Sequence, residues 1–375
     1  MPDLFYATPT DAEAALLDRL PELTREFAAT AAEFDDRAEL PVAHLERLYR
    51  DGFDRATLDA DLGGGGIGHE VFGEIVARIA TADPSLATVW LMHVGAATGL
   101  ANLTRDGLGT YYAEAFLDGE RFANALSEPT SGNRFLNPQQ EAVRAEGGYT
   151  LSGAKRFVSG SELAKHLLVN VAIDGEPVFF GYEPDATLNI IPIWDTLGLR
   201  ATRSQLLEFD GTLLRDSHRA TNPPGRFNAI NAGLSSISIG VAQAALDALI
   251  DHARNRVIAG RPLSHQQWVQ FEVADAEIKL TAVRAAARRA LRLADLGDPA
   301  SFSAIDRAKY LANKVAVEIA ALGVRIGGAS GFLRSSPIQR HLRDAQAGQL
   351  MAYSTEVIAG QVGKLVLGVE EAEGN

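Results

Sequence analysis

The chain of 375 residues lacks cysteine altogether and contains only three methionines and three tryptophans. The absence of cysteine excludes disulfides, thiolate metal ligands and cysteine nucleophiles. Long apolar runs are missing too: a membrane helix needs about 20 apolar residues, and the longest run, residues 315–322, is interrupted by Glu318. We therefore expect no membrane span.

Positive charge is also scarce, since 35 basic residues stand against 48 acidic ones and give a net charge of −13. Nucleic-acid binders carry a basic face, so this balance argues against nucleic acid as a partner. The eight histidines show no metal-ligand spacing, and no metal site is expected. The acidic N-terminus lacks the basic start of a secretory signal, which favours a cytoplasmic location.

The patterns that are present predict an α+β protein, mainly α, with three domains. Apolar residues at three- and four-residue spacing predict an N-terminal helical domain, residues 1–121. Short apolar or alternating runs between turn residues predict a mostly antiparallel sheet in residues 122–225. Within it, Asp174-Gly175 is a typical hairpin turn. Helical patterns return in residues 226–375.

The last of these domains is predicted to be a helical bundle around one buried helix. Residues 227–257 are rich in Ala, Ile and Leu and apolar around most of the helix surface. A helix of that kind is buried on several sides. Further helices over residues 264–296, 301–322 and 336 to the end would complete the bundle.

A glycine-rich segment, residues 62–68, formally fits the spacing of a dinucleotide fingerprint with Gly63, Gly65 and Gly68. Such a fingerprint follows a buried strand, whereas residues 54–61 are charged. The pattern therefore favours a turn between two helices.

Two other patches carry small hydroxyl and glycine residues that offer backbone N–H groups to a ligand. The first combines residues 125–133 with residues 152–160 at expected strand ends, where a flat ligand would fit with Phe157 against its ring. The second combines residues 323–332 with 342–345, and its glycine loop suits a phosphate or an adenine edge. Ordinary β-turns and a plain helix–helix connection are the alternatives.

These patches, taken in order, resemble the acyl-CoA dehydrogenase family over essentially the whole chain. The similar motifs are Leu62–Gly68, Leu126–Pro129 with Gly132, Gly153–Gly160, Leu197–Arg200, Arg256 with Gly260 and Gln267, Gly327–Gly331, and Arg343–Ala345. The resemblance implies a helical domain, a middle antiparallel β domain and a C-terminal four-helix bundle. It also implies a homotetramer or homodimer.

The same resemblance implies non-covalent FAD between the sheet and the C-terminal bundle. The implied cofactor residues are Leu126, Ser127, Phe157 and Ser159 around the flavin ring, Arg256 at the pyrophosphate of a neighbouring subunit, and Arg325, Gly328 and Ser354 toward the adenine. On the substrate side the implied residues are Asn133 and Asn231. The implied partners are an acyl-CoA or acyl-carrier-protein thioester and an electron acceptor such as an electron-transfer flavoprotein.

The chain departs from the family pattern at the catalytic base. The family usually carries a glutamate at a fixed distance after the R-D-A motif, and here that position is Ala352 or, on the alternative alignment, Tyr353. A minority carries the glutamate near the start of the long central helix, where this chain has Asn228 and Asn231. Abstraction of an α-proton from a thioester needs a positioned base.

Three side chains are candidates to replace the missing glutamate. Glu356 lies four residues after Ala352, so on a continuous helix the two side chains would share a face. Tyr353 is a candidate if its pKa is depressed. His93 is a polar residue on an otherwise apolar helix, although such a residue is more often a hydrogen-bonded core residue than a catalyst.

The sequence leaves three functions open. The first is α,β-dehydrogenation of an acyl thioester with hydride transfer to flavin N5, which the resemblance as a whole implies. A two-component flavin-dependent monooxygenase of the same fold needs no thioester base and fits the missing glutamate. A catalytically inactive flavin or acyl-CoA-binding paralogue fits it too, although the near-complete flavin motifs argue for a bound cofactor.

Overall fold

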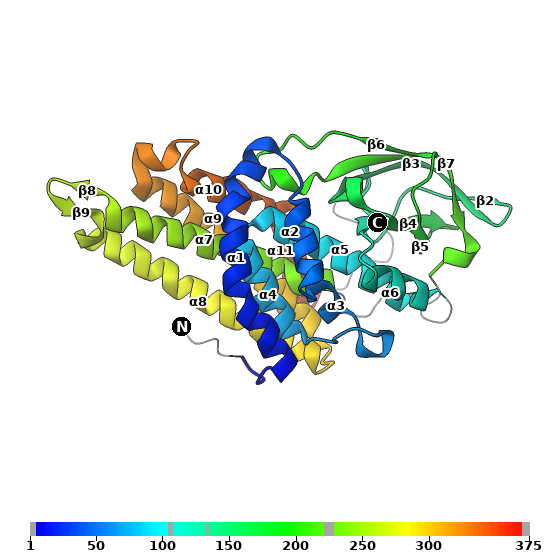
Figure 1. Ribbon diagram of the computed structural model, residues 1–375, viewed down its shortest axis with the longest axis horizontal. Coiled ribbons are helices and arrows are strands. Elements are labelled where there is room, and N and C mark those ends of the chain that lie inside the picture. The colour runs from blue at the N-terminus through cyan, green and yellow to red at the C-terminus, as the bar shows by residue number, and fades with distance from the viewer. Residues whose placement is uncertain (1–4, 104–107, 133–134, 221–228, 370–375) are drawn as a thin grey trace.

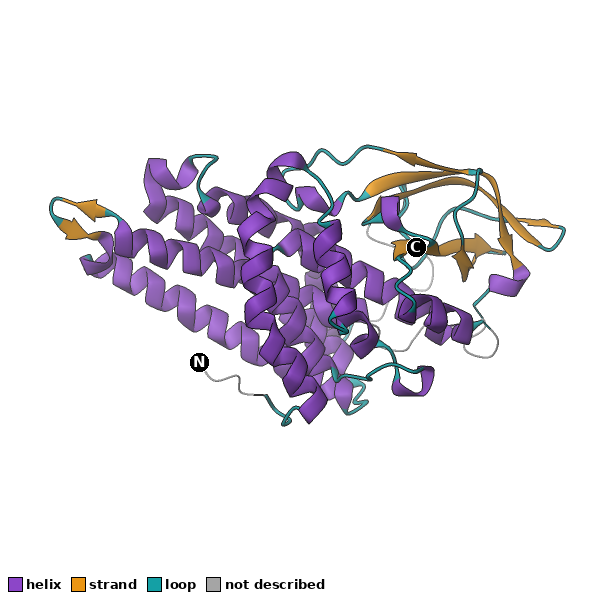
Figure 2. Ribbon diagram, in the orientation of Figure 1, coloured by secondary structure: helices purple, strands orange, loops and turns teal. Residues whose placement is uncertain are grey.

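The computed structural model describes residues 5–103, 108–132, 135–220 and 229–369. The molecule is elongated, with helices over most of its length and the larger sheets gathered at one end (Figure 1, Figure 2). The element order is helices, then strands, then helices. This confirms the predicted α+β fold that is mainly α.

The N-terminal helices begin and end where capping residues place them. The first begins after Thr10, whose hydroxyl accepts the Glu13 N–H while the Glu13 carboxylate accepts the Thr10 N–H. Asp83 caps the fifth helix through the Ser85 and Leu86 N–H groups. The six helices are α1 (Asp11–Arg37), α2 (Val42–Arg50), α3 (Phe53–Thr57), α4 (His69–Ala82), α5 (Pro84–Leu103) and α6 (Gly109–Leu117).

The glycine-rich segment is a tight turn before α4, as predicted. A Cβ on Gly64 would lie 2.0 Å from the Leu58 carbonyl oxygen, and one on Gly65 would lie 2.9 Å from the Ala56 Cα. These glycines are therefore required by close backbone approach rather than by phosphate binding.

The middle residues form two small sheets. One has the strand order β1 (Phe122–Ala125), β4 (His166–Ile173), β5 (Glu176–Tyr182), and the other β2 (Val143–Ala145), β3 (Gly148–Val158), β7 (Gln205–Arg215), β6 (Leu188–Ile191). All of these neighbours pair antiparallel except β1 and β4, which pair parallel. Asp174 and Gly175 form the β4–β5 hairpin with φ of 54° and 80°, which confirms the predicted turn.

The prediction of a loop over residues 152–160 was wrong, because β3 continues to Val158. Its pairing with β7 shifts register between Leu151 and Gly153 and again between Lys155 and Val158. These irregularities mark β-bulges, which hide the alternating pattern of a strand from the sequence.

The C-terminal bundle surrounds α7 (Ala229–Asn255) with α8 (Gln267–Asp295), α9 (Ala300–Phe332) and α10 (Pro337–Leu350), and α11 (Thr355–Leu367) packs against α9. A short hairpin of β8 (Val257–Ile258) and β9 (Arg261–Pro262) closes the far end of α7. By length and hydropathy, α9 and residues 230–255 of α7 would suffice to cross a membrane, but 78% of the α7 window is buried inside the bundle and 44% of the α9 window. A central helix that is buried on several sides, as predicted for residues 227–257, is equally long and apolar without crossing a membrane.

Two predicted helix boundaries in this bundle were wrong. The helix predicted over residues 301–322 runs to Phe332 and bends at Gly328, whose φ of 54° and ψ of −146° only glycine adopts readily. The helix predicted from residue 336 to the end is two helices. Ala352 and Tyr353 both have positive φ, 34° and 62°, and interrupt it between α10 and α11.

Candidate functional site

A cleft of about 1090 Å³ lies where α5, α7 and α9 meet the first sheet. Its inner wall is apolar and includes Leu126, Phe135, Leu168, Phe179, Ile230 and Ile305. The polar side chains that line it include Thr98, Asn102, Asn124, Asn231, Asp306 and Tyr353. A large apolar cavity with a few polar groups is the usual form of a small-molecule site.

The two segments of the first ligand-binding patch, the chain after β1 and the end of β3, meet beside this cleft. Leu126 lines the cleft, and the next residue, Ser127, accepts a hydrogen bond from the Arg156 N–H at 2.8 Å through its backbone oxygen. The adjacent Phe157 has a φ of 61° and a side chain that is 51% exposed. A bulky residue in this left-handed conformation is strained, and such strain clusters at ligand sites.

The surroundings of Phe157 fit the edge and face of a flavin ring. Trp194 stands edge-on to Phe157 with ring centroids 6.1 Å apart, and the Arg156 guanidinium lies 4.6 Å over the Phe157 ring. The Arg156 Nε is buried without a hydrogen-bond partner among the described residues. An exposed aromatic face beside an unsatisfied donor is an arrangement that a flat ligand with acceptor atoms completes.

Ser159 is nine-tenths buried just beyond Phe157 and belongs to a chain of hydroxyl groups. Its Oγ lies 2.8 Å from the Ser204 Oγ, which lies 2.8 Å from the Thr202 Oγ1. Because Thr202 also donates to the Leu199 carbonyl, the chain has a fixed direction. In this order Ser204 donates to Thr202 and Ser159 donates to Ser204, so the Ser159 oxygen is left able to accept a hydrogen bond from a ligand donor.

The motif residues Glu128 and Lys155 form a buried ion pair that supports this platform. The Lys155 Nζ donates to Glu128 Oε1 at 2.7 Å and to Asn170 Oδ1 at 3.0 Å, and both charged side chains are fully buried. The second Glu128 oxygen accepts the Gln139 N–H at 2.8 Å. These two motif positions therefore fix the loop that carries Leu126 and Ser127.

His93 does not reach the cleft. Its Nδ1 accepts the Phe122 N–H at 3.0 Å, so its Nε2–H donates to Asp54 at 3.3 Å. Trp90 and Arg121 donate to the same buried carboxylate. Burial lowers the pKa of His93, and these hydrogen bonds hold the ring in the core, away from the cleft.

Of the other two base candidates, only Tyr353 lines the cleft. Its ring packs on Phe135 with centroids 4.8 Å apart. Burial, and then the nearby Asp306, raise the pKa of Tyr353, so the depressed pKa that a basic tyrosine needs is not present. Glu356 is exposed in the first turn of α11, and the backbone break at Ala352 removes the shared helix face on which its candidacy rested.

A carboxylate that the sequence analysis did not consider, Asp306, lines the same cleft from α9. One turn further along that helix, the buried Lys309 Nζ donates to the Met351 and Tyr353 carbonyl oxygens at 2.9 and 2.8 Å. Burial lowers the pKa of Lys309 to about 8. No motif marks Asp306, and only its position three residues before a buried lysine on the same helix hinted at it.

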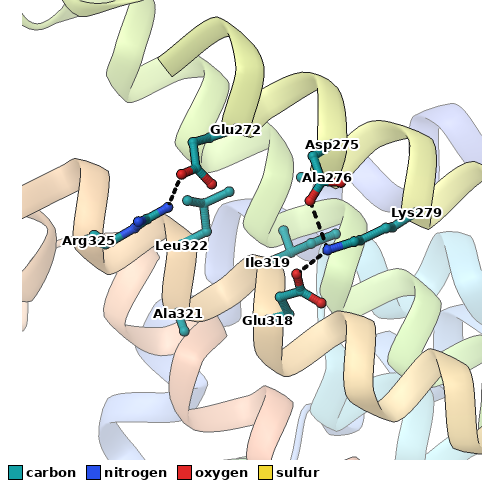
Figure 3. Close-up of a pocket in the computed structure, with 9 residues that line it drawn as sticks. All are labelled: Glu272, Asp275, Ala276, Lys279, Glu318, Ile319, Ala321, Leu322 and Arg325. Atoms are coloured by element: carbon teal, nitrogen blue, oxygen red, sulfur yellow. Dashed lines mark hydrogen bonds and ion pairs between the residues drawn. The ribbon is translucent and has the colours of Figure 1, made fainter. Parts of the chain in front are cut away.

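The residues predicted for the pyrophosphate and adenine lie away from this cleft. Arg256 is exposed at the β8–β9 end of the molecule, opposite the larger sheets (Figure 1). Arg325 pairs with Glu272 at 2.5 Å in a groove of about 270 Å³ between α8 and α9, where Lys279 bridges Asp275 and Glu318 (Figure 3). One chain therefore does not bring Arg256 to the Phe157 platform.

Of the remaining predicted site residues, one lines the cleft, two hold positions in helices and one lies outside the described residues. Asn231 lines the cleft, and Gly328 provides the bend in α9. Ser354 caps α11 by accepting the Val357 N–H. Asn133 lies outside the described residues, as does Asn228.

The comparisons with known proteins agree with this geometry. Residues 225–367 match the acyl-CoA dehydrogenase C-terminal domain. The chain is 27% identical to the 3-sulfinopropanoyl-CoA desulfinase of Paraburkholderia xenovorans (strain LB400), covering 96% of this chain and 97% of that one. It is 26% identical to the mitochondrial short-chain specific acyl-CoA dehydrogenase of Bos taurus, covering 89% and 84%.

Two solved structures share the fold. Butyryl-CoA dehydrogenase from Megasphaera elsdenii superposes with a TM-score of 0.87 at 23% identity, over 96% of this chain and 99% of that chain. KijD3, solved with FMN and a dTDP-linked amino sugar, superposes with a TM-score of 0.84 at 25% identity, over 98% and 97%. The resemblance to the acyl-CoA dehydrogenase family, a family of flavin-dependent oxidoreductases, is therefore confirmed.

Proposed function

We propose that this acyl-CoA dehydrogenase-like chain is a flavin-dependent oxidoreductase that removes hydrogen from the α and β carbons of an acyl thioester bound in the cleft. The observation that carries the proposal is the junction at Leu126 and Ser127. There an apolar cleft ends against the strained, half-exposed Phe157 platform. Substrate and redox cofactor would meet at that junction.

The names of the relatives support a thioester as the substrate class. A desulfinase and a dehydrogenase, each matched over most of the chain, are both named for coenzyme A thioesters. The apolar inner wall suits an acyl chain, because burying its methylene groups stabilises the complex by about 0.8 kcal/mol each.

The chain's own residues would hold and orient the two reactants. Phe157 and Trp194 would lie against the flavin, and the Ser159 oxygen would accept a hydrogen bond from one of its N–H or O–H groups. Leu126 and Phe135 would exclude water from the reacting carbons. When bound, the flavin supplies the two-electron oxidant, while the protein supplies orientation and electrostatics.

Further parts of the proposal concern the assembly. We propose FAD as the flavin, a homodimer or homotetramer in which Arg256 reaches a neighbouring copy, an electron-transfer flavoprotein as acceptor, and a cytoplasmic location. The distance along the bundle supports the neighbouring copy. Helix α7, with 27 residues, is about 40 Å long at 1.5 Å per residue, and Arg256 lies at its far end.

An anaerobic titration of the purified protein tests the function. Saturated acyl-CoAs of increasing chain length are added, and the oxidised flavin absorbance is followed. Bleaching by one chain length is the expected result. No bleaching by any thioester would overturn the proposal.

A second candidate, a two-component flavin-dependent monooxygenase, is favoured by one observation: the positions of the usual glutamate are occupied by Ala352 and Tyr353. Oxygen consumption with reduced flavin and an aromatic or amine substrate would distinguish it. Sulfite release from 3-sulfinopropanoyl-CoA without bleaching would point instead to the chemistry for which the first relative is named. A protein that binds flavin but does none of these would be the inactive paralogue.

A further inference from the structure

The missing glutamate leaves the proposed reaction without a base, and the cleft has a carboxylate, Asp306, beside the turn where that glutamate would stand. Asp306 lines the cleft together with Ile305 and Phe302 of the same helix. Leu126 and Phe135 line the same cleft, and Phe135 packs on Tyr353 of the α10–α11 turn. Among the cleft-lining residues of α7, α9 and the α10–α11 turn, Asp306 is the only described carboxylate.

The turn between α10 and α11 is held beside this carboxylate. Two consecutive residues with positive φ, Ala352 and Tyr353, make the turn strained. Lys309, one turn after Asp306 on α9, fixes it through two carbonyl oxygens. Asp306 therefore stands next to the turn that carries the glutamate in the proteins this chain resembles.

The environment of Asp306 suits proton transfer. No described residue donates a hydrogen bond to its carboxylate, so its oxygens are available to a ligand. Burial raises its pKa, while Lys309 and Arg307 act in the opposite direction. A base whose pKa is moved toward neutrality is the more effective one in this reaction class.

We infer that Asp306 is the general base of this cleft. The inference rests on the proposed function. In the step, the Cα–H bond of the thioester breaks as an O–H bond forms on the Asp306 carboxylate. The released electron pair would become the second Cα–Cβ bond, and a bound oxidised flavin would supply the two-electron acceptor for the β-hydrogen and its bonding pair.

The test compares Asp306→Asn with Asp306→Glu, Glu356→Gln and a matched carboxylate on the same helix, Glu318→Gln. Two readouts are measured for each: the rate of flavin bleaching by the best acyl-CoA, and exchange of the thioester α-proton with solvent deuterium. Asp306→Asn should lower both by about 10² to 10⁴-fold. Asp306→Glu, which retains a carboxylate, should lose less, and Glu318→Gln should change neither.

The outcomes separate the inference from the proposed function. If the wild type bleaches and Asp306→Asn bleaches equally fast, or if Glu356→Gln alone loses activity, the inference is wrong and the function stands. If the wild type exchanges the α-proton in an Asp306-dependent way without bleaching, the base assignment stands and the dehydrogenation does not. If the wild type does neither, both fall. A flavin spectrum and melting temperature like those of the wild type show that Asp306→Asn is folded.

Discussion

Single residues at this site carry strain and buried charge that the rest of the fold supports. Phe157 adopts a left-handed conformation with half of its side chain exposed, and Lys155 is charged, fully buried and paired. Neither arrangement favours stability by itself. Both belong to β3, whose Arg156 N–H bonds the oxygen of Ser127 next to the cleft-lining Leu126, and each leads to a prediction.

Phe157→Gly is expected to weaken flavin binding at least tenfold while changing the free energy of unfolding by less than about 1 kcal/mol. Relief of the left-handed strain would stabilise the folded variant by roughly 1–2 kcal/mol. Glycine also loses more backbone entropy on folding than phenylalanine does, and this loss offsets the gain. Flavin affinity is measured by fluorescence titration of the apoprotein, and stability by urea unfolding. Unchanged flavin affinity would show that Phe157 is not part of the flavin site.

Lys155→Met is expected to destabilise the protein by roughly 3–5 kcal/mol, because it leaves the Glu128 carboxylate buried without its partner. Lys165→Met is the matched control. It breaks the Lys165–Glu120 pair, whose lysine is 68% exposed, and should cost less than about 1 kcal/mol. Urea unfolding of both variants checks this, and equal losses would contradict the assignment of Glu128 and Lys155 as a structural pair.

At the scale of elements, helix ends are joined to each other by side chains from distant parts of the sequence. Asp295, near the end of α8, accepts the His69 N–H at 2.6 Å and the Glu70 N–H at 3.3 Å at the start of α4. It also bonds the His69 Nδ1 at 2.8 Å. A single carboxylate thus caps a helix that begins 226 residues away in the sequence, and residues of both helices line the cleft.

Asp295→Ala is expected to lower the free energy of unfolding by roughly 1–2 kcal/mol at neutral pH, as the loss of a cap does. Burial raises the pKa of Asp295, but the hydrogen bonds from His69 and Glu70 outweigh it, and the net pKa is lowered. The stabilisation is therefore complete above the unfolded-state pKa of about 3.9 and is lost as pH falls below it. The difference between wild type and variant, measured by urea unfolding at several pH values, should shrink at acidic pH; a constant difference would contradict this account.

At the scale of the whole molecule, the sheet region is attached to the bundle through two motifs that the sequence singled out separately. The Leu199 N–H donates to Asp344 at 2.8 Å, and the Arg343 guanidinium donates to the Leu197 oxygen at 2.8 Å and pairs with Asp35 of α1. A Cβ on Gly198 would lie 2.3 Å from the Arg343 carbonyl oxygen. Residues 197–200 and 343–345 are therefore a docking contact that joins three parts of the chain.

Asp344→Asn is expected to make the protein more stable than the wild type above pH 7, by at least about 1 kcal/mol. Burial raises the pKa of Asp344 to about 7, so the folded state favours the protonated acid. The protonated Asp344 stabilises the folded state fully below the unfolded-state pKa of about 3.9, and this stabilisation is lost as pH rises through 7. Each unit of difference between the folded and unfolded pKa is worth about 1.4 kcal/mol. Asparagine keeps an acceptor for Leu199 without the charge. A variant that is less stable than the wild type at pH 8 would show that the ionised carboxylate stabilises the contact.

The sequence by itself determined the order of helices and strands, the Asp174-Gly175 hairpin, the buried central helix and the motif set that marks the flavin family. These follow from local periodicity, turn chemistry and residue type, which act over a few residues. It also placed Leu126, Phe157 and Ser159 in one patch, and the fold brings them together.

Only the tertiary structure decided which groups face the cleft. The extension of β3 and the break before α11 depend on bulges and left-handed residues that no periodicity reveals. His93 lies in the core, where it bonds Asp54 and the Phe122 N–H. Glu356 lies at the surface because the chain is interrupted between α10 and α11. Asp306 faces the cleft because α9 packs against α7 and the α10–α11 turn. Such packing joins segments that are distant in the sequence, so the residues next to Asp306 do not encode it.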